Sequence, residues 1–186
     1  MPLRTRLHIF RLRSFGLGLA LLGLVFLSPR EGHGQIFEVV DDEPAFLALG
    51  LGAFDALDAD TAGQFHFEYR SNLRLWIFKP HGGLFVSTDG AVYGYAGLRV
   101  DVFLGRRWVL SPSTAIGLFE EGSGKDLGHA LEFRSGIELA YRFDDRSRLS
   151  AGLFHLSNAS IGNRNPGEES VMLFYALPID RFLKHW

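Results

Sequence analysis

The feature that most restricts the fold is an alternation of apolar and polar residues that recurs throughout the chain after residue 36. From Leu131 to Phe143 the apolar side chains share one parity and the charged side chains share the other, with Ser135 as the exception. Successive side chains of a strand point to opposite faces, so this stretch predicts a strand with one apolar and one charged face. The same pattern occurs in 64–70 and in 92–104.

The charged faces indicate where these strands lie. A soluble sandwich would bury them in its core, where an unpaired charge is costly. In a membrane barrel the apolar face contacts lipid and the charged face fills a narrow polar interior. The residues expected inside are His66, Glu68, Arg70, Arg99, Asp101, Glu132, Arg134, Glu138 and Arg142. We interpret them as a structural ion network; the alternative is a small pore, although the interior of a narrow barrel is usually filled by side chains.

The sequence predicts an all-β fold, an eight-stranded antiparallel transmembrane β-barrel that occupies residues 36–186 as a single domain. After residue 36 no apolar stretch reaches the roughly 18 residues that a transmembrane helix requires. The expected strands lie near 43–56, 62–71, 73–87, 90–104, 108–120, 130–143, 147–159 and 169–179. Pro80, with Gly82 and Gly83, predicts a kink or bulge in the third strand, and Pro112 a similar irregularity in the fifth.

Residues 1–35 are interpreted as a cleavable signal peptide. Four arginines, the last of them Arg13, precede an apolar run from Phe15 to Leu27, and small residues follow at Gly32 and Gly34. The alternative is a membrane anchor, but the run is too short to cross a hydrocarbon core of about 30 Å comfortably. Export would place both ends of the barrel in the periplasm. Short turns at 71–72, 105–107 and 144–147 would then face the periplasm, and most of the outer connections would be longer.

Several classes of function are disfavoured by composition. The chain has no cysteine, which excludes a disulfide scaffold, a thiolate metal site and a cysteine nucleophile. Its formal net charge of −2 gives no indication of polyanion binding, and no nucleic-acid motif or phosphate loop occurs. His81, His129 and His185 lack the spacing of metal ligands. We therefore expect neither a metal nor a cofactor.

Residues with catalytic potential lie in the segment 154–170, which reads FHLSNASIGNRNPGEES. His155 and Ser157 share the parity of the apolar side chains before them, so both are expected to face lipid near the extracellular rim. Polar side chains that face lipid find few hydrogen-bond partners, so their presence there indicates a function. Glu169 begins the next strand, where it can lie beside His155 across the hairpin. Glu168 is its rival, but its parity places it inside the barrel.

These residue types meet the requirements of an activated serine. Ser157 would be the nucleophile, His155 the general base, and Glu169 the group that orients the imidazole and stabilises its charged form. Asn158 could stabilise the oxyanion through its side-chain amide or its backbone N–H. Asn163 and Asn165, next to Pro166-Gly167, are interpreted as turn formers.

The segment resembles the lipid A 3-O-deacylases (PagL), in which a His-x-Ser-Asn stretch ends the seventh strand and a glutamate begins the eighth. The matching residues here are His155, Ser157, Asn158, Ala159 and Glu169, and the resemblance extends through 173–178. It implies an eight-stranded outer-membrane barrel that hydrolyses the ester-linked 3-hydroxyacyl chain of lipid A, with a Ser-His-Glu triad and no metal. The segment 162–168 differs from the family members, which leaves the lipid preference open.

Three functions remain open from the sequence. The first is a lipid A deacylase of the bacterial outer membrane, whose partners are lipopolysaccharide and membrane lipids rather than nucleic acid. The second is a structural or adhesive barrel without enzymatic activity. The third is an esterase that acts on another acyl lipid. The sequence does not decide whether the chain forms a homodimer.

Overall fold

The computed structural model describes residues 37–38, 43–58 and 61–179. The expected signal peptide, residues 1–35, lies outside them and stays a prediction. The strands are β1 (Phe37–Glu38), β2 (Phe46–Phe54), β3 (Ala62–Arg70), β4 (Lys79–Ser87), β5 (Val92–Arg99), β6 (Val102–Leu104), β7 (Trp108–Glu120), β8 (Leu131–Arg142), β9 (Arg148–Ser157) and β10 (Glu168–Pro178). Among the described residues, no helix has the length and apolar character needed to cross a membrane.

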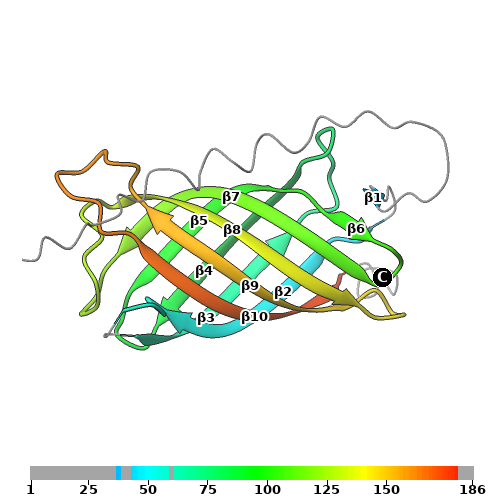
Figure 1. Ribbon diagram of the computed structural model, residues 1–186, viewed down its shortest axis with the longest axis horizontal. Helices are drawn as coiled ribbons and strands as arrows, with labels where there is room; N and C mark the ends of the chain where they lie inside the picture. Colours follow the sequence, from blue (N-terminus) through cyan, green and yellow to red (C-terminus); the bar gives the residue numbers. More distant parts are fainter. Residues whose placement is uncertain (1–36, 39–42, 59–60, 180–186) are drawn as a thin grey trace, which may run out of the picture. The chain divides into compact units, whose positions relative to one another are not determined.

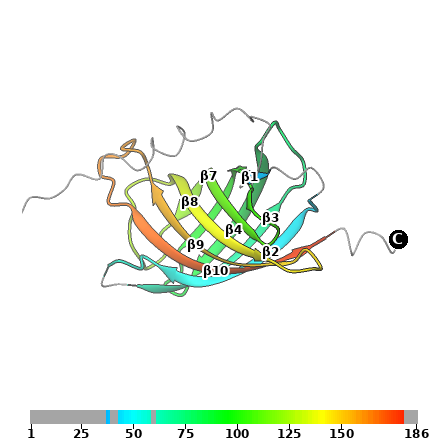
Figure 2. The ribbon, with the colours of Figure 1, turned by 45° about the vertical axis from the view of Figure 1, so that its right-hand side comes forward.

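The strands form one closed antiparallel sheet. Its order is β1-β6-β7-β5-β4-β3-β2-β10-β9-β8, and the pairing of β7 with β8 closes the ring. The strands run obliquely and together form the wall of the barrel (Figure 1). In both views β9 and β10 lie side by side (Figure 2). The two-residue β1 pairs only with β6 and lies outside the closed ring. Since β5 and β6 are two parts of the expected fourth strand, the ring contains eight strands, and the prediction of an eight-stranded barrel is confirmed for the described residues.

The third strand begins later than predicted. It was expected from residue 73 after a tight turn at 71–72, but β4 starts at Lys79. The connection folds back on itself through a bridge between Leu75 and Phe78, and Trp76 adopts a φ of 63°. The alternating apolar residues of 73–78 therefore belong to a turn beyond the barrel wall, so parity alone placed them wrongly in the strand.

No bulge occurs at Pro80, so that part of the prediction is wrong. Pairing with β5 runs without a break from Lys79↔Arg99 to Val86↔Val92. Pro112 does produce an irregularity, although it appears in the strand opposite. The Val100 N–H donates to the Pro112 carbonyl at 3.0 Å, but proline has no N–H to return the bond. The ladder is consequently interrupted between β5 and β6, while both segments keep the same register against β7.

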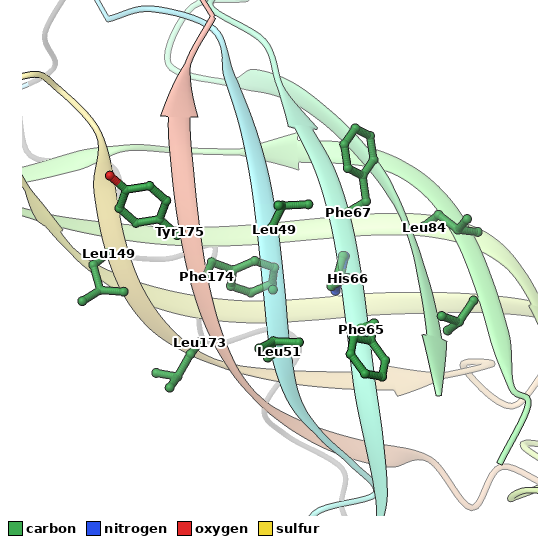
Figure 3. A pocket seen from close by; sticks show the side chains of 12 residues that line it. Leu49, Leu51, Phe65, His66, Phe67, Leu84, Leu149, Leu173, Phe174 and Tyr175 are labelled. Atoms are coloured by element: carbon green, nitrogen blue, oxygen red, sulfur yellow. The ribbon is translucent and has the colours of Figure 1, made fainter. Parts of the chain in front are cut away.

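The outer face of the wall is apolar, as the alternation predicted. Two rows of side chains stand on it around a shallow groove across β9, β10, β2, β3 and β4 (Figure 3). Leu51, Phe65 and Leu173 belong to one row and are more than half exposed. His66 and Phe174 lie behind the strands, where their rings pack edge to face at 5.1 Å between centroids. In a membrane this face contacts acyl chains.

Inside the barrel, charged side chains pair with one another. The Arg70 guanidinium donates two hydrogen bonds to Glu138, at 2.9 and 2.8 Å, and a third to Glu68 at 2.6 Å. Arg99 lies within 3.7 Å of Glu68, Asp101 and Glu138. The predicted ion network is confirmed, except that Glu132 is buried without a hydrogen-bond partner in the described part of the chain.

The network also contains three residues that were not predicted: Glu43, Lys79 and Arg148. Arg148 donates to Glu43 at 2.7 Å and to Asp101 at 3.0 Å, while Lys79 donates to Asp101 at 3.3 Å. Glu43 precedes β2 and is buried. The end of the interior near the short turns is thereby filled, which favours the structural interpretation over a pore.

Candidate active site on the lipid-facing wall

The candidate site lies where β9 ends and β10 begins. His155 and Glu169 are direct cross-strand partners, and His155 Nδ1 lies 3.2 Å from Glu169 Oε1. The side chains remain 43% and 45% exposed, so both groups reach the outer surface of the wall. The predicted contact between this carboxylate and this imidazole is therefore confirmed, whereas their catalytic roles stay predictions.

Glu168 lies on the other face, as its parity predicted. It is buried, and its carboxylate accepts a hydrogen bond from the backbone N–H of Asp55 at 3.2 Å and one from the Ser170 hydroxyl at 3.0 Å. Those bonds hold the end of β2 against the start of β10. Glu168 therefore supports the hairpin from within, and Glu169 is the carboxylate that contacts the imidazole.

Ser157 is the last residue of β9 and lies on the same face as His155, two residues further toward the rim. Its side chain is half-buried and makes no hydrogen bond in the described part of the chain. The imidazole also packs on Gly167: a Cβ there would lie 2.9 Å from His155 Cε1 and 3.5 Å from Nε2. With a φ of +69°, Gly167 closes the loop tightly against the ring, a role that the sequence had not indicated.

Asn158 does not have the free donors that its predicted oxyanion role requires. The two amide hydrogens donate to the carbonyls of Leu127 (2.9 Å) and Arg164 (2.8 Å). Its backbone N–H donates to Asn165 Oδ1 at 3.0 Å, and its side-chain oxygen accepts from the Ser160 N–H at 2.9 Å. In this structure Asn158 is fully buried and ties the 158–167 connection to the barrel, while its oxyanion role stays a prediction.

Residues 121–130, which connect β7 to β8, support residues 158–167, which connect β9 to β10. Arg164 pairs with Asp126, and its backbone packs against Gly128, which has a φ of +89°. A Cβ on Gly128 would lie 2.5 Å from the Arg164 carbonyl oxygen, so only glycine permits this approach. Leu127, which lies between Asp126 and Gly128 in the sequence, is buried. The 158–167 connection is thereby held in one position.

A second ion pair holds the connection between β2 and β3. Lys125 donates to Asp55 at 2.7 Å and to Asp58 at 2.6 Å. The hydrogen bond from Lys125 lowers the pKa of the exposed Asp58 carboxyl below its usual value. Three connections at the site end are therefore joined around β9 and β10. Among the described residues, no group of side chains could hold a metal ion.

Both the sequence and the fold resemble those of known proteins. The family model described as lipid A 3-O-deacylase (PagL) matches residues 55–178, which include both site strands. The chain belongs to this family. The crystal structure of the outer membrane enzyme PagL aligns with a TM-score of 0.60 at 19% sequence identity, over 72% of this chain and 99% of that one. Among curated proteins, no sequence gives a significant match.

Membership in the PagL family and the barrel fold place the chain in the outer membrane. Its outer face, lined with leucine and phenylalanine, is then the surface that contacts lipid. His155, Ser157 and Glu169 lie on that same face. These side chains are therefore reached from outside the barrel wall rather than through its interior.

Proposed function

We propose that the chain hydrolyses the ester-linked 3-hydroxyacyl chain at the 3-position of lipid A in the outer leaflet, with Ser157, His155 and Glu169 as its triad. The observation that carries this proposal is the contact between His155 Nδ1 and Glu169 Oε1 on the lipid-facing side of a barrel end. A carboxylate and an imidazole in contact there are costly unless they serve a substrate. Family membership supports the substrate class.

The reaction would proceed in two steps. His155 Nε2 accepts the proton of Ser157 as Oγ attacks the ester carbonyl, and Glu169 stabilises the imidazolium through Nδ1–H. Collapse of the tetrahedral intermediate breaks the bond to the sugar 3-oxygen, which takes the proton from His155. Water, activated by the same imidazole, then releases the fatty acid from Ser157 and restores the hydroxyl.

We propose the Asn165 amide as the donor to the oxyanion. Asn165 Oδ1 accepts the Asn158 N–H, which fixes the orientation of the side chain beside the serine. Its amide nitrogen donates to no group in the described part of the chain and remains available. A fixed donor of this kind stabilises developing charge without reorganising during the reaction.

The test is mass spectrometry of lipid A from cells that express the wild-type protein or Ser157→Ala, each checked for a folded barrel. We expect the loss of one 3-hydroxyacyl mass with the wild type only. Unchanged lipid A in both would contradict the proposal. Release of fatty acid from phospholipid, assayed on the same membranes, would then identify the chain as an esterase of another acyl lipid.

A further inference from the structure

One polar row crosses the lipid-facing wall at the level of His155. Ser135 of β8 is the cross-strand partner of His155, and Thr114 of β7 is the partner of Ser135. With Glu169 on β10, the row contains four polar side chains from four consecutive strands. Ser135 is the one residue that interrupted the apolar parity of β8, whose neighbours on this face are Phe133 and Ile137.

The two hydroxyls of this row lack partners within the described chain. Neither Ser135 Oγ nor Thr114 Oγ1 makes a hydrogen bond there; Thr114 is exposed and Ser135 half-buried on the outer face. A hydroxyl that faces hydrocarbon without a partner costs free energy, and an apolar side chain would avoid that cost. The unpaired hydroxyl beside the imidazole therefore indicates a ligand that supplies the partner.

The position of Ser135 relative to the nucleophile restricts what that ligand is. Ser157 pairs with Phe133, so Ser135 is its diagonal neighbour, one level further from the rim. Diagonal neighbours on one face lie about 7–8 Å apart, and directly opposite ones about 5 Å. Glu169 occupies one side of His155 and Ser135 the other. An acyl chain with its carbonyl at Ser157 and its tail in the membrane would next pass the level of His155 and Ser135.

Building on the proposed function, we propose that the Ser135 hydroxyl binds the 3-hydroxyl of the acyl chain that is cleaved. One methylene group separates that hydroxyl from the ester carbonyl, so it reaches the surface one level below the nucleophile. Thr114 extends the same polar row further from the site. A site that hydrogen-bonds a substrate hydroxyl discriminates against the analogue that lacks it. Ser135 is thus a specificity-determining residue that favours 3-hydroxyacyl over unsubstituted acyl esters.

The test uses the full-length protein, folded in detergent micelles, and two glucosamine phosphates esterified at the 3-oxygen with 3-hydroxymyristate or with myristate. We expect Ser135→Ala to lower kcat/KM for the hydroxylated ester by about 3- to 10-fold, the range of one hydrogen bond, and to leave the myristate ester nearly unchanged. Ser135→Thr, which keeps the hydroxyl, should retain the wild-type preference. Thr114→Val should alter the preference less than Ser135→Ala.

Other outcomes separate the two proposals. If wild type cleaves the hydroxylated ester but Ser135→Ala changes both esters equally, or neither, the Ser135 subsite is wrong and the deacylase remains. If Ser135→Ala abolishes both reactions while Ser157→Ala does not, Ser135 is the nucleophile, and both the subsite and the triad are overturned. A folded wild type that cleaves neither ester overturns the proposed function together with the inference.

Discussion

Polar side chains occur on both faces of the barrel wall, and the charged network inside differs from the serine hydroxyls near the site outside in whether the side chains have partners. Inside, Arg70, Glu68 and Glu138 form short, multiple hydrogen bonds and are almost fully buried. Outside, Ser157 and Ser135 make no hydrogen bond in the described part of the chain. Paired charges inside fill the barrel and fix its structure, whereas unpaired hydroxyls outside remain available to a lipid substrate.

The largest effect expected from this contrast is on activity at the outer face. Ser157→Ala should lower the rate of deacylation by at least about 10³-fold because the nucleophile is lost. Its free energy of unfolding should change by less than about 0.5 kcal/mol, because the hydroxyl has no partner to lose. Rate assays on lipid A and urea unfolding in vesicles measure the two quantities. A large loss of stability would show that Ser157 has a structural role that the contact pattern does not reveal.

The next largest effect on activity is expected from substitutions of the two adjacent glutamates, Glu168 and Glu169. Glu169→Gln should lower kcat by about 10²- to 10⁴-fold, because the amide cannot stabilise the imidazolium as the carboxylate does. Glu168→Gln keeps its shape inside the barrel and should retain most of the activity. Kinetics of the two variants on one lipid A preparation make the comparison. The reverse order of effects would assign the imidazole to Glu168 and contradict the strand register at the site.

A substitution in the interior should lower the free energy of unfolding rather than the activity. Arg70→Met leaves Glu68 and Glu138 without their main partner and should cost about 3–5 kcal/mol of unfolding free energy. Arg106→Met, which removes an exposed arginine from a turn, is the matched control and should change little. Urea midpoints in vesicles test this, and activity per folded molecule should remain near wild type. A folded Arg70→Met barrel without activity would implicate the interior in catalysis.

A smaller effect is expected at the loop above the serine. Asn165→Asp removes the free amide donor and places a negative charge near the oxyanion, so kcat should fall by about 10²- to 10³-fold with KM little changed. Asn158→Asp instead weakens the bonds to Leu127 and Arg164 and should raise the protease sensitivity of 158–167. If Asn165→Asp has wild-type kcat, the oxyanion donor lies elsewhere.

Parity explains why much of this arrangement was predictable. One alternation placed His155 and Glu169 on the outer face, Glu168 and Arg134 on the inner face, and the strands within a few residues of their observed bounds. The same argument failed for 73–78, where alternating residues form a turn, because parity does not report where pairing stops. It also gave no indication that Glu43, just before β2, enters the interior.

The contacts of the loops depend on residues far apart in the sequence. The role of Asn158 is set by the carbonyl of Leu127, and the position of Arg164 by Gly128. A local motif could show that Asn158 follows the serine, but it could not show that its amide hydrogens are already engaged. The sequence showed Ser135 as an exception to the apolar pattern of its strand. Only the strand register showed that this residue lies beside His155.

The most direct test of the central claim is covalent labelling of the folded barrel with a long-chain alkyl fluorophosphonate, followed by peptide mass mapping. This reagent reacts with a serine that a neighbouring base activates. The account predicts that the label is found on Ser157 in the wild type and is absent from His155→Ala. Labelling of Ser135 in place of Ser157, or no labelling of a folded and accessible barrel, would contradict it.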